Sequence, residues 1–213
     1  ARGDYILPLD ADDRIARTYA AEAAEILDRH PEIGIVYCRA GLFGDQRGEW
    51  LLPPFSIERL LVDNMIFASA LFRRRDWEQA GGYNPNMTYG MEDYDFWLRA
   101  SIHFRFATLD EVLYDYRVHG ESLSTLSEGR NHELATVVLE RALPKMTWLG
   151  RTHRAAAHAR LMRAHAFAGD PGGAWRHLLR ALLASPGTLF FGRYFRLAAD
   201  DERIAALLPP SRA

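Results

Sequence analysis

Strand-like and helix-like patterns alternate over the first 120 residues of this 213-residue chain. Runs rich in β-branched and aromatic residues predict strands at 5–9, 33–43, 69–73 and 104–116. Between these runs, apolar residues recur every three or four positions and predict helices at 16–29, 56–64, 75–80 and 92–102. Strands that alternate with helices indicate an α/β sheet packed on both faces.

The pattern becomes helical from about residue 128 onward. Breaks rich in Pro and Gly separate four further predicted helices, at 131–143, 152–168, 173–185 and 188–198. Two of them resemble a single tetratricopeptide-like hairpin, which is too little for a solenoid of stacked repeats. We therefore predict two domains, an α/β domain over 1–127 and an α-helical extension over 128–213.

Composition is that of an ordinary globular chain, with 48% hydrophobic residues, 25% charged residues and a net charge of -2. This length can bury one core plus an appendage. The charge gives no general attraction to nucleic acid or acidic membranes, so we expect no nucleic-acid partner. The single cysteine, Cys38, excludes an internal disulfide framework and favours a reducing compartment. We therefore expect a cytoplasmic protein.

Three carboxylates, Asp10, Asp12 and Asp13, follow the first predicted strand. Alternate side chains of a strand share a face, so Asp10 and Asp12 are expected to project together where the strand ends. Hard oxygen ligands at an accessible turn suit a divalent cation that bridges phosphates and keeps several waters. The alternative is an Asp-rich turn that only starts the next helix, and for Asp13 we favour a helix-capping role.

Three more motifs follow in order: Gly81-Gly82-Tyr83, Gly90-Met91-Glu92-Asp93 and Tyr116-Arg117-Val118-His119-Gly120. Together with the acidic turn they resemble the second half of a family 2 glycosyltransferase with a GT-A fold. The resemblance covers about residues 1–125, with a DxD-type metal motif, a glycine-rich loop, an xED motif and a late histidine. Each motif is short, and the ordered set is what makes the resemblance specific. It implies a partial GT-A mixed sheet with flanking helices.

The resemblance implies a metal-assisted transfer of a sugar from a nucleotide-sugar donor to a hydroxyl, with inversion. Asp12 would be the direct ligand of a divalent cation, Mn²⁺ or Mg²⁺, and His119 would complete that site. Asp10 would contact the donor or support the metal through water. For His119, the alternative is an incidental polar residue after a strand.

The same resemblance assigns Asp93 as the general base and Glu92 as a residue that positions the acceptor. A carboxylate in the first turn of a helix is expected to stay ionised through the helix dipole, and so to accept a proton. The alternative is that acidic residues here only stabilise the helix start. Gly81 and Gly82 would line the donor and acceptor cleft, because only glycine lets a backbone approach a substrate so closely. A helix C-cap is the other role for this pair.

Two neighbours of this acidic pair are expected to be structural. Asp95 lies two residues beyond Asp93 and faces away from it on a helix, so we predict an internal hydrogen bond or ion pair. Trp97 shares the face of Asp93, and we predict core packing for it rather than sugar stacking.

The chain departs from the family pattern at its start. Family members begin with further βα units that hold the nucleotide base, whereas only nine residues precede Asp10 here. We therefore expect the N-terminal nucleotide-binding units to be missing from this sequence. A rival interpretation is a non-catalytic GT-A remnant whose helical tail mediates protein–protein assembly. A nucleotidyltransferase is less favoured, because it gives no reason for Glu92-Asp93 and His119.

The resemblance also implies an acceptor and a place in the cell. The acceptor would be a glycan, a lipid-linked oligosaccharide or a protein, in bacterial surface glycan or polysaccharide synthesis. Residues 178–195 carry a dense apolar set interrupted by arginines, too short and too charged to span a bilayer. Packing within the protein is favoured for this set, and peripheral contact with the inner face of the membrane is the alternative.

Overall fold

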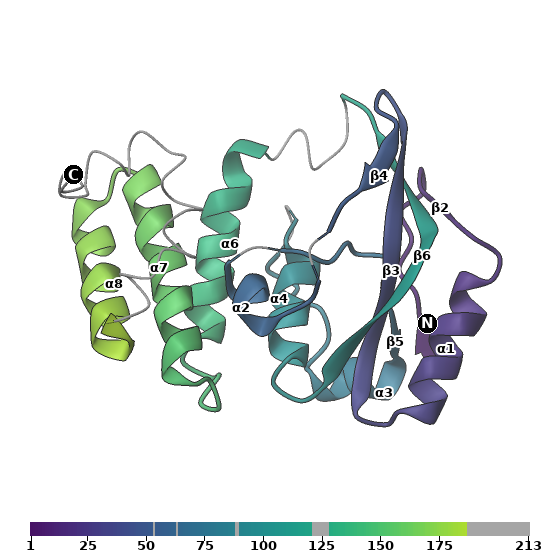
Figure 1. Cartoon of the computed structure of the whole chain (residues 1–213), viewed down its shortest axis with the longest axis horizontal. Helices are drawn as coiled ribbons and strands as arrows, with labels where there is room; N and C mark the ends of the chain where they lie inside the picture. Colours follow the sequence, from purple (N-terminus) through teal and green to yellow (C-terminus); the bar gives the residue numbers. More distant parts are fainter. Residues whose placement is uncertain (53, 63, 88–89, 121–127, 187–213) are drawn as a thin grey trace. The chain divides into compact units, whose positions relative to one another are not determined.

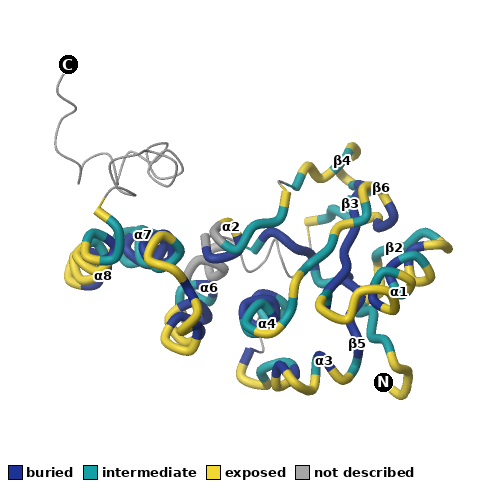
Figure 2. The backbone as a smooth tube through the Cα atoms, turned by 60° about the horizontal axis from the view of Figure 1, so that its bottom comes forward, coloured by how far each residue is buried: buried dark blue, intermediate teal, exposed yellow. Residues whose placement is uncertain are grey.

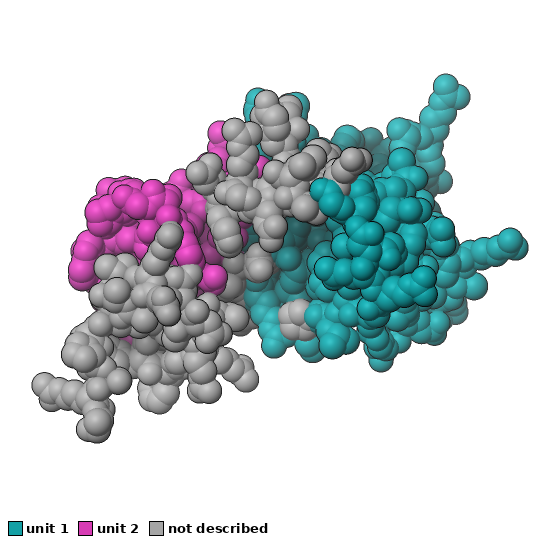
Figure 3. All heavy atoms as spheres, turned by 90° about the horizontal axis from the view of Figure 1, so that it is seen from above, with its two compact units in different colours: residues 1–60, 64–131 teal, residues 61–63, 132–213 magenta. Residues whose placement is uncertain are grey.

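The computed structural model describes all residues except 53, 63, 88–89, 121–127 and 187–213. The chain divides into two compact units, residues 1–60 with 64–131, and residues 61–63 with 132–213 (Figure 3). The first unit holds the sheet and the second holds the C-terminal helices. The predicted helix at 188–198 and most of the apolar set at 178–195 lie outside the described residues.

The first unit is built on one mixed sheet of six strands (Figure 1). The strands are β1 (Tyr5–Ile6), β2 (Arg14–Ile15), β3 (Ile33–Gly44), β4 (Gly48–Trp50), β5 (Leu71–Arg73) and β6 (Arg105–Val118). Their order is β1-β5-β3-β6-β2, and β4 forms a hairpin with β3. The long strands β3 and β6 pair in parallel, while the other pairs are antiparallel. The predicted α/β class is confirmed.

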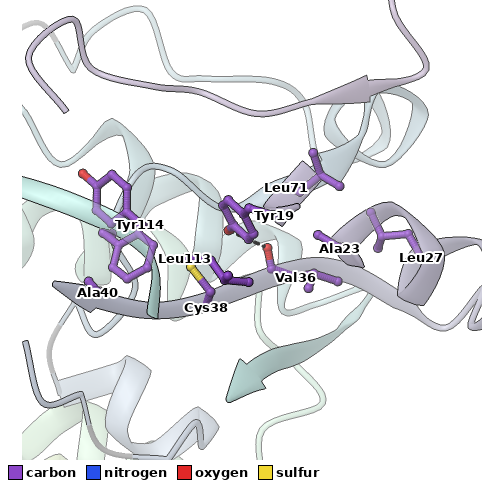
Figure 4. Close-up of a cluster of buried hydrophobic side chains, with 10 residues drawn as sticks. Tyr19, Ala23, Leu27, Val36, Cys38, Ala40, Leu71, Leu113 and Tyr114 are labelled. Carbon is purple, nitrogen blue, oxygen red and sulfur yellow. Dashed lines mark hydrogen bonds between the residues drawn. The ribbon is translucent and has the colours of Figure 1, made fainter. Parts of the chain in front are cut away.

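Helix α1 (Tyr19–Arg29) covers one face of this sheet. Its residues Tyr19, Ala23 and Leu27 recur at helical spacing and are fully buried against Val36 and Cys38 of β3 (Figure 4). The Tyr19 hydroxyl donates to the carbonyl of Ser69 at 2.8 Å, which satisfies this buried polar group. Burial also raises the pKa of the Cys38 thiol to about 11, so this cysteine is a core residue.

Helix α4 (Glu92–Ala100) packs through aromatic rings against strands of the same sheet. Phe72 of β5 lies 4.9 Å from Phe96 and 6.0 Å from Trp97, measured between ring centroids. Trp97 also meets Phe106 of β6 at 6.5 Å and has no exposed surface, so its predicted core role is confirmed. This packing fixes the start of α4, where the xED-like pair lies. The short helices α2 (Ile57–Val62) and α3 (Arg74–Gln79) complete the order of elements before it.

The start of the chain differs from its prediction. Strand β1 contains only Tyr5 and Ile6, and Asp10 to Asp13 form a turn closed by a backbone hydrogen bond of 3.2 Å. The acidic residues therefore owe their orientation to the turn and not to strand alternation. The predicted capping role of Asp13 is wrong, because α1 begins at Tyr19 with Thr18 at its N-cap position.

The second unit carries α6 (Glu128–Ala142), α7 (Arg151–Phe167) and α8 (Pro171–Ala184). These helices match the predicted segments 131–143, 152–168 and 173–185. Helix α7 packs along α8, and the buried side of each appears dark in Figure 2. Asp170 caps α8 by accepting a 2.9 Å hydrogen bond from the Gly173 amide. Within the described ranges, no helix has both the length and the apolar character needed to cross a bilayer.

Candidate functional site

The acidic turn is tied to the end of β6 through Asp13. Its carboxylate accepts a hydrogen bond from the Tyr114 hydroxyl and another, of 2.7 Å, from the Arg117 amide. These bonds join residues more than 100 positions apart in the sequence. Asp13 therefore holds the acidic turn beside the residues that lead into His119.

Asp12 and His119 lie together at this edge of the sheet. His119 follows the last residue of β6, and its Nε2 lies 2.8 Å from Oδ2 of Asp12. The hydrogen bond to His119 is the main cause that holds the pKa of Asp12 below its usual value. The two side chains are 43% and 34% exposed, so ligands can reach both. A carboxylate and an imidazole in contact, open to solvent, fit a divalent cation that takes its other ligands from phosphate and water.

Asp10 connects the turn electrostatically to α4. Burial raises the pKa of Asp10, and the negative charges of Asp13, Asp12 and Glu92 raise it further. Glu92 is 82 positions away in sequence, so its effect on the pKa of Asp10 shows that the fold brings the start of α4 near the acidic turn. A cluster of carboxylates of this kind attracts cations.

Asp93, at the start of α4, accepts two hydrogen bonds and has a shifted pKa. Its Oδ2 accepts a 3.0 Å hydrogen bond from the side-chain amide of Asn64, and its Oδ1 accepts one of 2.7 Å from the backbone amide of Tyr94. Burial nevertheless raises its pKa to about 6, with a further rise from Glu92. The sequence-based argument expected the helix dipole to dominate, but desolvation outweighs it. Asp93 is therefore about half ionised near pH 6 and mostly ionised at neutral pH.

The backbone before this pair is strained. Met91 has a φ of 66°, the left-handed region that side chains other than glycine rarely adopt, and Gly90 before it has a φ of 111°. Met91 occupies the N-cap position of α4, and its side chain makes no capping hydrogen bond. Backbone strain of this kind collects at functional sites, where the surrounding structure supports it.

Gly81 and Gly82 follow Ala80, the C-cap residue of α3, and close the end of that helix. The Gly82 amide donates to the Trp77 carbonyl at 2.8 Å and the Gly81 amide to the Glu78 carbonyl at 3.0 Å, which is a Schellman motif. Both glycines have positive φ, and a Cβ on Gly82 would approach the Trp77 ring to 3.0 Å. The structure thus accounts for the glycines as a cap, and their cleft-lining role stays a prediction.

The glycine cap leads directly to Tyr83. Burial raises the pKa of the Tyr83 hydroxyl, and the charges of Asp93 and Glu92 raise it further. Tyr83 therefore lies near the acidic pair, which brings the glycine motif and the xED-like motif into one region. A protonated hydroxyl here is a hydrogen-bond donor to oxygen atoms of a ligand.

The neighbouring acidic residue of α4 is structural, as predicted. Asp95 is buried and accepts two hydrogen bonds from Arg99, of 2.9 and 2.6 Å. Its partner lies one helical turn along the same helix, so the pair stabilises α4 and leaves Asp93 to face elsewhere.

Sequence reasoning missed the roles of four site residues: Asn64, Tyr83, Tyr114 and Arg117. Asn64 lies 29 positions before Asp93 in an irregular segment, and only the fold brings them together. Arg117 was part of the late motif, yet its contacts were not foreseen. Its guanidinium donates to the Asp12 carbonyl at 3.1 Å and lies 4.8 Å from the Phe43 ring centroid. It places a positive charge beside the acidic turn.

Two comparisons by sequence are negative: no family model matches the chain, and no curated protein matches it. Comparison of folds finds solved structures. With the crystal structure of Staphylococcus aureus TarS 1–349 the TM-score is 0.54 at 18% identity, over 87% of this chain and 57% of that chain. The same TarS chain in complex with UDP gives a TM-score of 0.51 at 17% identity, with the same coverage. The chain has a GT-A-like glycosyltransferase fold.

The crystal structure of the longer TarS chain agrees, with a TM-score of 0.54 at 17% identity over 98% of this chain and 36% of that one. This chain therefore spans less than two thirds of the length of the TarS chains that it matches. At these identities the likeness concerns the fold, and one of the matched chains binds UDP.

Proposed function

We propose that this chain is the catalytic part of a family 2 glycosyltransferase that transfers a sugar from a nucleotide-sugar donor to a hydroxyl acceptor with inversion. One observation carries the proposal. The charge of Glu92 raises the pKa of both Asp10 and Asp93, and His119 contacts Asp12. The separate motifs of the resemblance therefore meet in one unit of the fold. The glycosyltransferase fold of the TarS structures supports the same reading.

In this proposal Asp93 accepts the proton of the acceptor hydroxyl. The hydroxyl oxygen then forms a bond to the anomeric carbon of the donor, and the bond from that carbon to the diphosphate oxygen breaks. Attack from the side opposite the diphosphate inverts the configuration. A base with a pKa of about 6 is ionised at neutral pH and still basic enough to take part in proton transfer. Asn64 keeps the carboxylate in place, and Glu92 orients the acceptor.

The diphosphate side of the reaction is assigned to the acidic turn. Asp12 and His119 would hold Mn²⁺ or Mg²⁺, with Asp10 in support, and a bound cation supplies neutralisation of the charge that develops on the leaving diphosphate. Asp13 keeps Asp12 beside His119 through its bonds to β6. Arg117 adds a positive charge at the same edge, where it favours an anionic ligand.

The proposal keeps three classes of acceptor: a glycan, a lipid-linked oligosaccharide or a protein. It places the reaction in the cytoplasm, at or near the inner face of the membrane, in bacterial surface glycan or polysaccharide synthesis. No nucleic acid takes part.

The test is a panel of nucleotide sugars incubated with the protein and Mn²⁺ or Mg²⁺, with release of nucleoside diphosphate as the readout. We expect release with one donor class and loss of release with a chelator or in Asp12→Ala. Glu111→Gln, at an exposed carboxylate on β6, is the matched control and should leave the rate unchanged. Nucleotide binding without release, equal in the protein and in Asp93→Asn, would instead support a non-catalytic remnant.

A further inference from the structure

The helical unit, which does not include the glycosyltransferase-like site, brings three potential metal ligands together. Glu140 of α6, His165 of α7 and His177 of α8 each offer one ligand atom, and these atoms all lie within 4.8 Å of one another. Among the residues that the structure describes, this is the one such group of three. Helix packing creates it, because the three residues belong to different helices and show no metal-binding spacing in the sequence.

We propose that Glu140, His165 and His177 form a binding site for a divalent transition metal of the Zn²⁺ class. Nε2 of His165 lies 3.0 Å from Oε1 of Glu140, and Nε2 of His177 lies 3.6 Å from the same oxygen. Ligands at tetrahedral angles around zinc are separated by about 3.3 Å, given metal–ligand distances of about 2.0 Å. These two separations bracket that value, and the ligand atoms of the two imidazoles lie within 4.8 Å of each other. Two imidazoles and one carboxylate favour zinc over Mg²⁺, because Mg²⁺ prefers sites made of oxygen ligands alone.

Each imidazole also has a partner on its other nitrogen. Nδ1 of His165 lies 2.9 Å from Oδ2 of Asp170, and Nδ1 of His177 lies 3.1 Å from Nδ1 of His158. Partners of this kind fix the ring so that Nε2 is presented to a metal, and a carboxylate partner raises the basicity of the ligand. His165 and His177 are stacked, with ring planes 14° apart and centroids 5.2 Å apart. Both rings are therefore oriented by contacts outside the ligand set.

The contact between His165 and Asp170 leaves no room for a side chain at Gly173. A Cβ at position 173 would lie 2.3 Å from Oδ2 of Asp170 and 2.4 Å from Nδ1 of His165. Any larger residue would separate the pair, so the start of α8 accommodates His165 and Asp170 only with glycine there. The same Asp170 caps α8, which ties the ring orientation to the helix itself.

His165 lies between two carboxylates. Its two ring nitrogens face two different carboxylates, Glu140 and Asp170. A neutral imidazole donates one hydrogen bond only, so one carboxylate is left facing a lone pair unless a second proton or a metal ion lies between them. A second proton on His165 would satisfy both carboxylates, but it would not explain the position of His177. A metal ion also accounts for His177, which converges on the same oxygen of Glu140 at a distance longer than a hydrogen bond.

The site is accessible from one side. The Glu140 side chain is 42% exposed, while those of His165 and His177 are 18% and 7% exposed. A metal could enter beside Glu140 and keep water as a fourth ligand, which three protein ligands normally leave room for. Bound there, it would link α6 to the α7–α8 pair and stabilise the helical unit, because ions that bind only the folded state shift folding toward it.

The experiment is a titration of the full chain with Zn²⁺ and with Co²⁺, in a background that carries Asp12→Ala and His119→Ala so that the other unit contributes no binding. Calorimetry should give one equivalent bound, and Co²⁺ should show visible absorption bands typical of tetrahedral nitrogen and oxygen ligands. His165→Gln and His177→Gln should each weaken binding by about a hundredfold or more. Asp170→Asn should weaken it by about tenfold to a hundredfold, because it acts through His165.

His153→Gln is the matched control, since it removes a histidine of α7 that is not in the ligand group. It should leave affinity and stoichiometry unchanged. Should a histidine variant fail to fold, ¹⁵N imidazole spectra of the background chain decide instead, because metal must shift Nε2 of two histidines. Absence of one-equivalent binding, or tight binding that survives both histidine substitutions, overturns the proposal and leaves a protonated His165 bridging two carboxylates.

Discussion

Both units of this chain place imidazole against carboxylate, but they do so by different means. In the sheet unit, His119 and Asp12 are 107 positions apart and meet at the edge of a sheet, where both are partly exposed. In the helical unit, His165, His177 and Glu140 lie on three helices within 37 positions, and the two imidazoles are more enclosed than that of His119. The first pair is held by turns and strand ends, and the second group by the packing of helices.

The difference shows what kinds of site a sequence reveals. Turn and strand-end residues form short motifs whose order can resemble that of a known family. Residues on packed helices need no local motif, because any position on a buried face can meet a neighbour. The histidines of the helical part show no ligand spacing, and only helix packing brings His165 and His177 close to Glu140.

The largest expected effect separates the two sites by their role in the reaction. Asp93→Asn keeps the size of the side chain and removes its ability to accept a proton, so kcat should fall about a hundredfold or more. The donor should still bind with unchanged Kd. His177→Gln should change kcat less than about twofold, because His177 belongs to the helical unit and not to the unit that carries the proposed catalytic residues. Steady-state rates and donor binding measured for both variants check this. Equal losses of rate in the two variants would break the comparison.

The second effect concerns how the acidic turn is held. Asp13→Ala removes the acceptor of the Tyr114 hydroxyl and of the Arg117 amide, and it should destabilise the protein by about 1–3 kcal/mol. Tyr114→Phe removes one donor only and should cost less. Urea unfolding of both variants measures the difference. A neutral effect of Asp13→Ala would show that the turn is held by other contacts.

The third effect is a pH dependence that belongs to the sheet unit. Because the proposed base is active when ionised and its pKa is raised to about 6, kcat/KM should fall as pH decreases through 6. Asn64→Leu removes a hydrogen bond that favours the ionised form, so the acid limb should move upward by about one pH unit. A profile of kcat/KM between pH 4.5 and 8 for both proteins tests this. An acid limb that does not move would assign the titration to another group.

The smallest effect is on stability. A carboxyl group whose pKa is higher in the folded state than in the unfolded state binds more protons when folded, so its contribution to stability decreases as pH rises from about 4 to 6. Asp93→Asn should therefore be more stable than the parent at pH 8, by less than about 1 kcal/mol because the single oxygen of asparagine cannot replace both carboxylate oxygens that accept hydrogen bonds here. At pH 4 the advantage should disappear. Thermal unfolding at the two pH values gives the comparison, and an advantage at pH 4 alone would contradict it.

Much of the sheet unit followed from the sequence. The periods of apolar residues located α1, β3, β5 and α4, since a helix or strand must bury one face and its residue spacing records that face. Trp97 and Asp95 were assigned correctly to the core and to an internal ion pair by their positions on a helix. The acidic residues, the glycine pair, Glu92-Asp93 and His119 were picked out by their order along the chain.

The tertiary structure decided the rest, because the spacing of residues along the chain does not predict desolvation or long-range contacts. It shortened the predicted strand before Asp10 to Tyr5–Ile6, followed the strand with a turn at Asp10 to Asp13, and gave Asp13 partners on β6 in place of a helix cap. It also reversed the expected direction for Asp93, whose burial outweighs the helix dipole. In the helical unit the sequence determined the helices. Which of their faces meet, and hence the meeting of Glu140, His165 and His177, was decided by packing, since helical periodicity marks the buried side of each helix but not its neighbour.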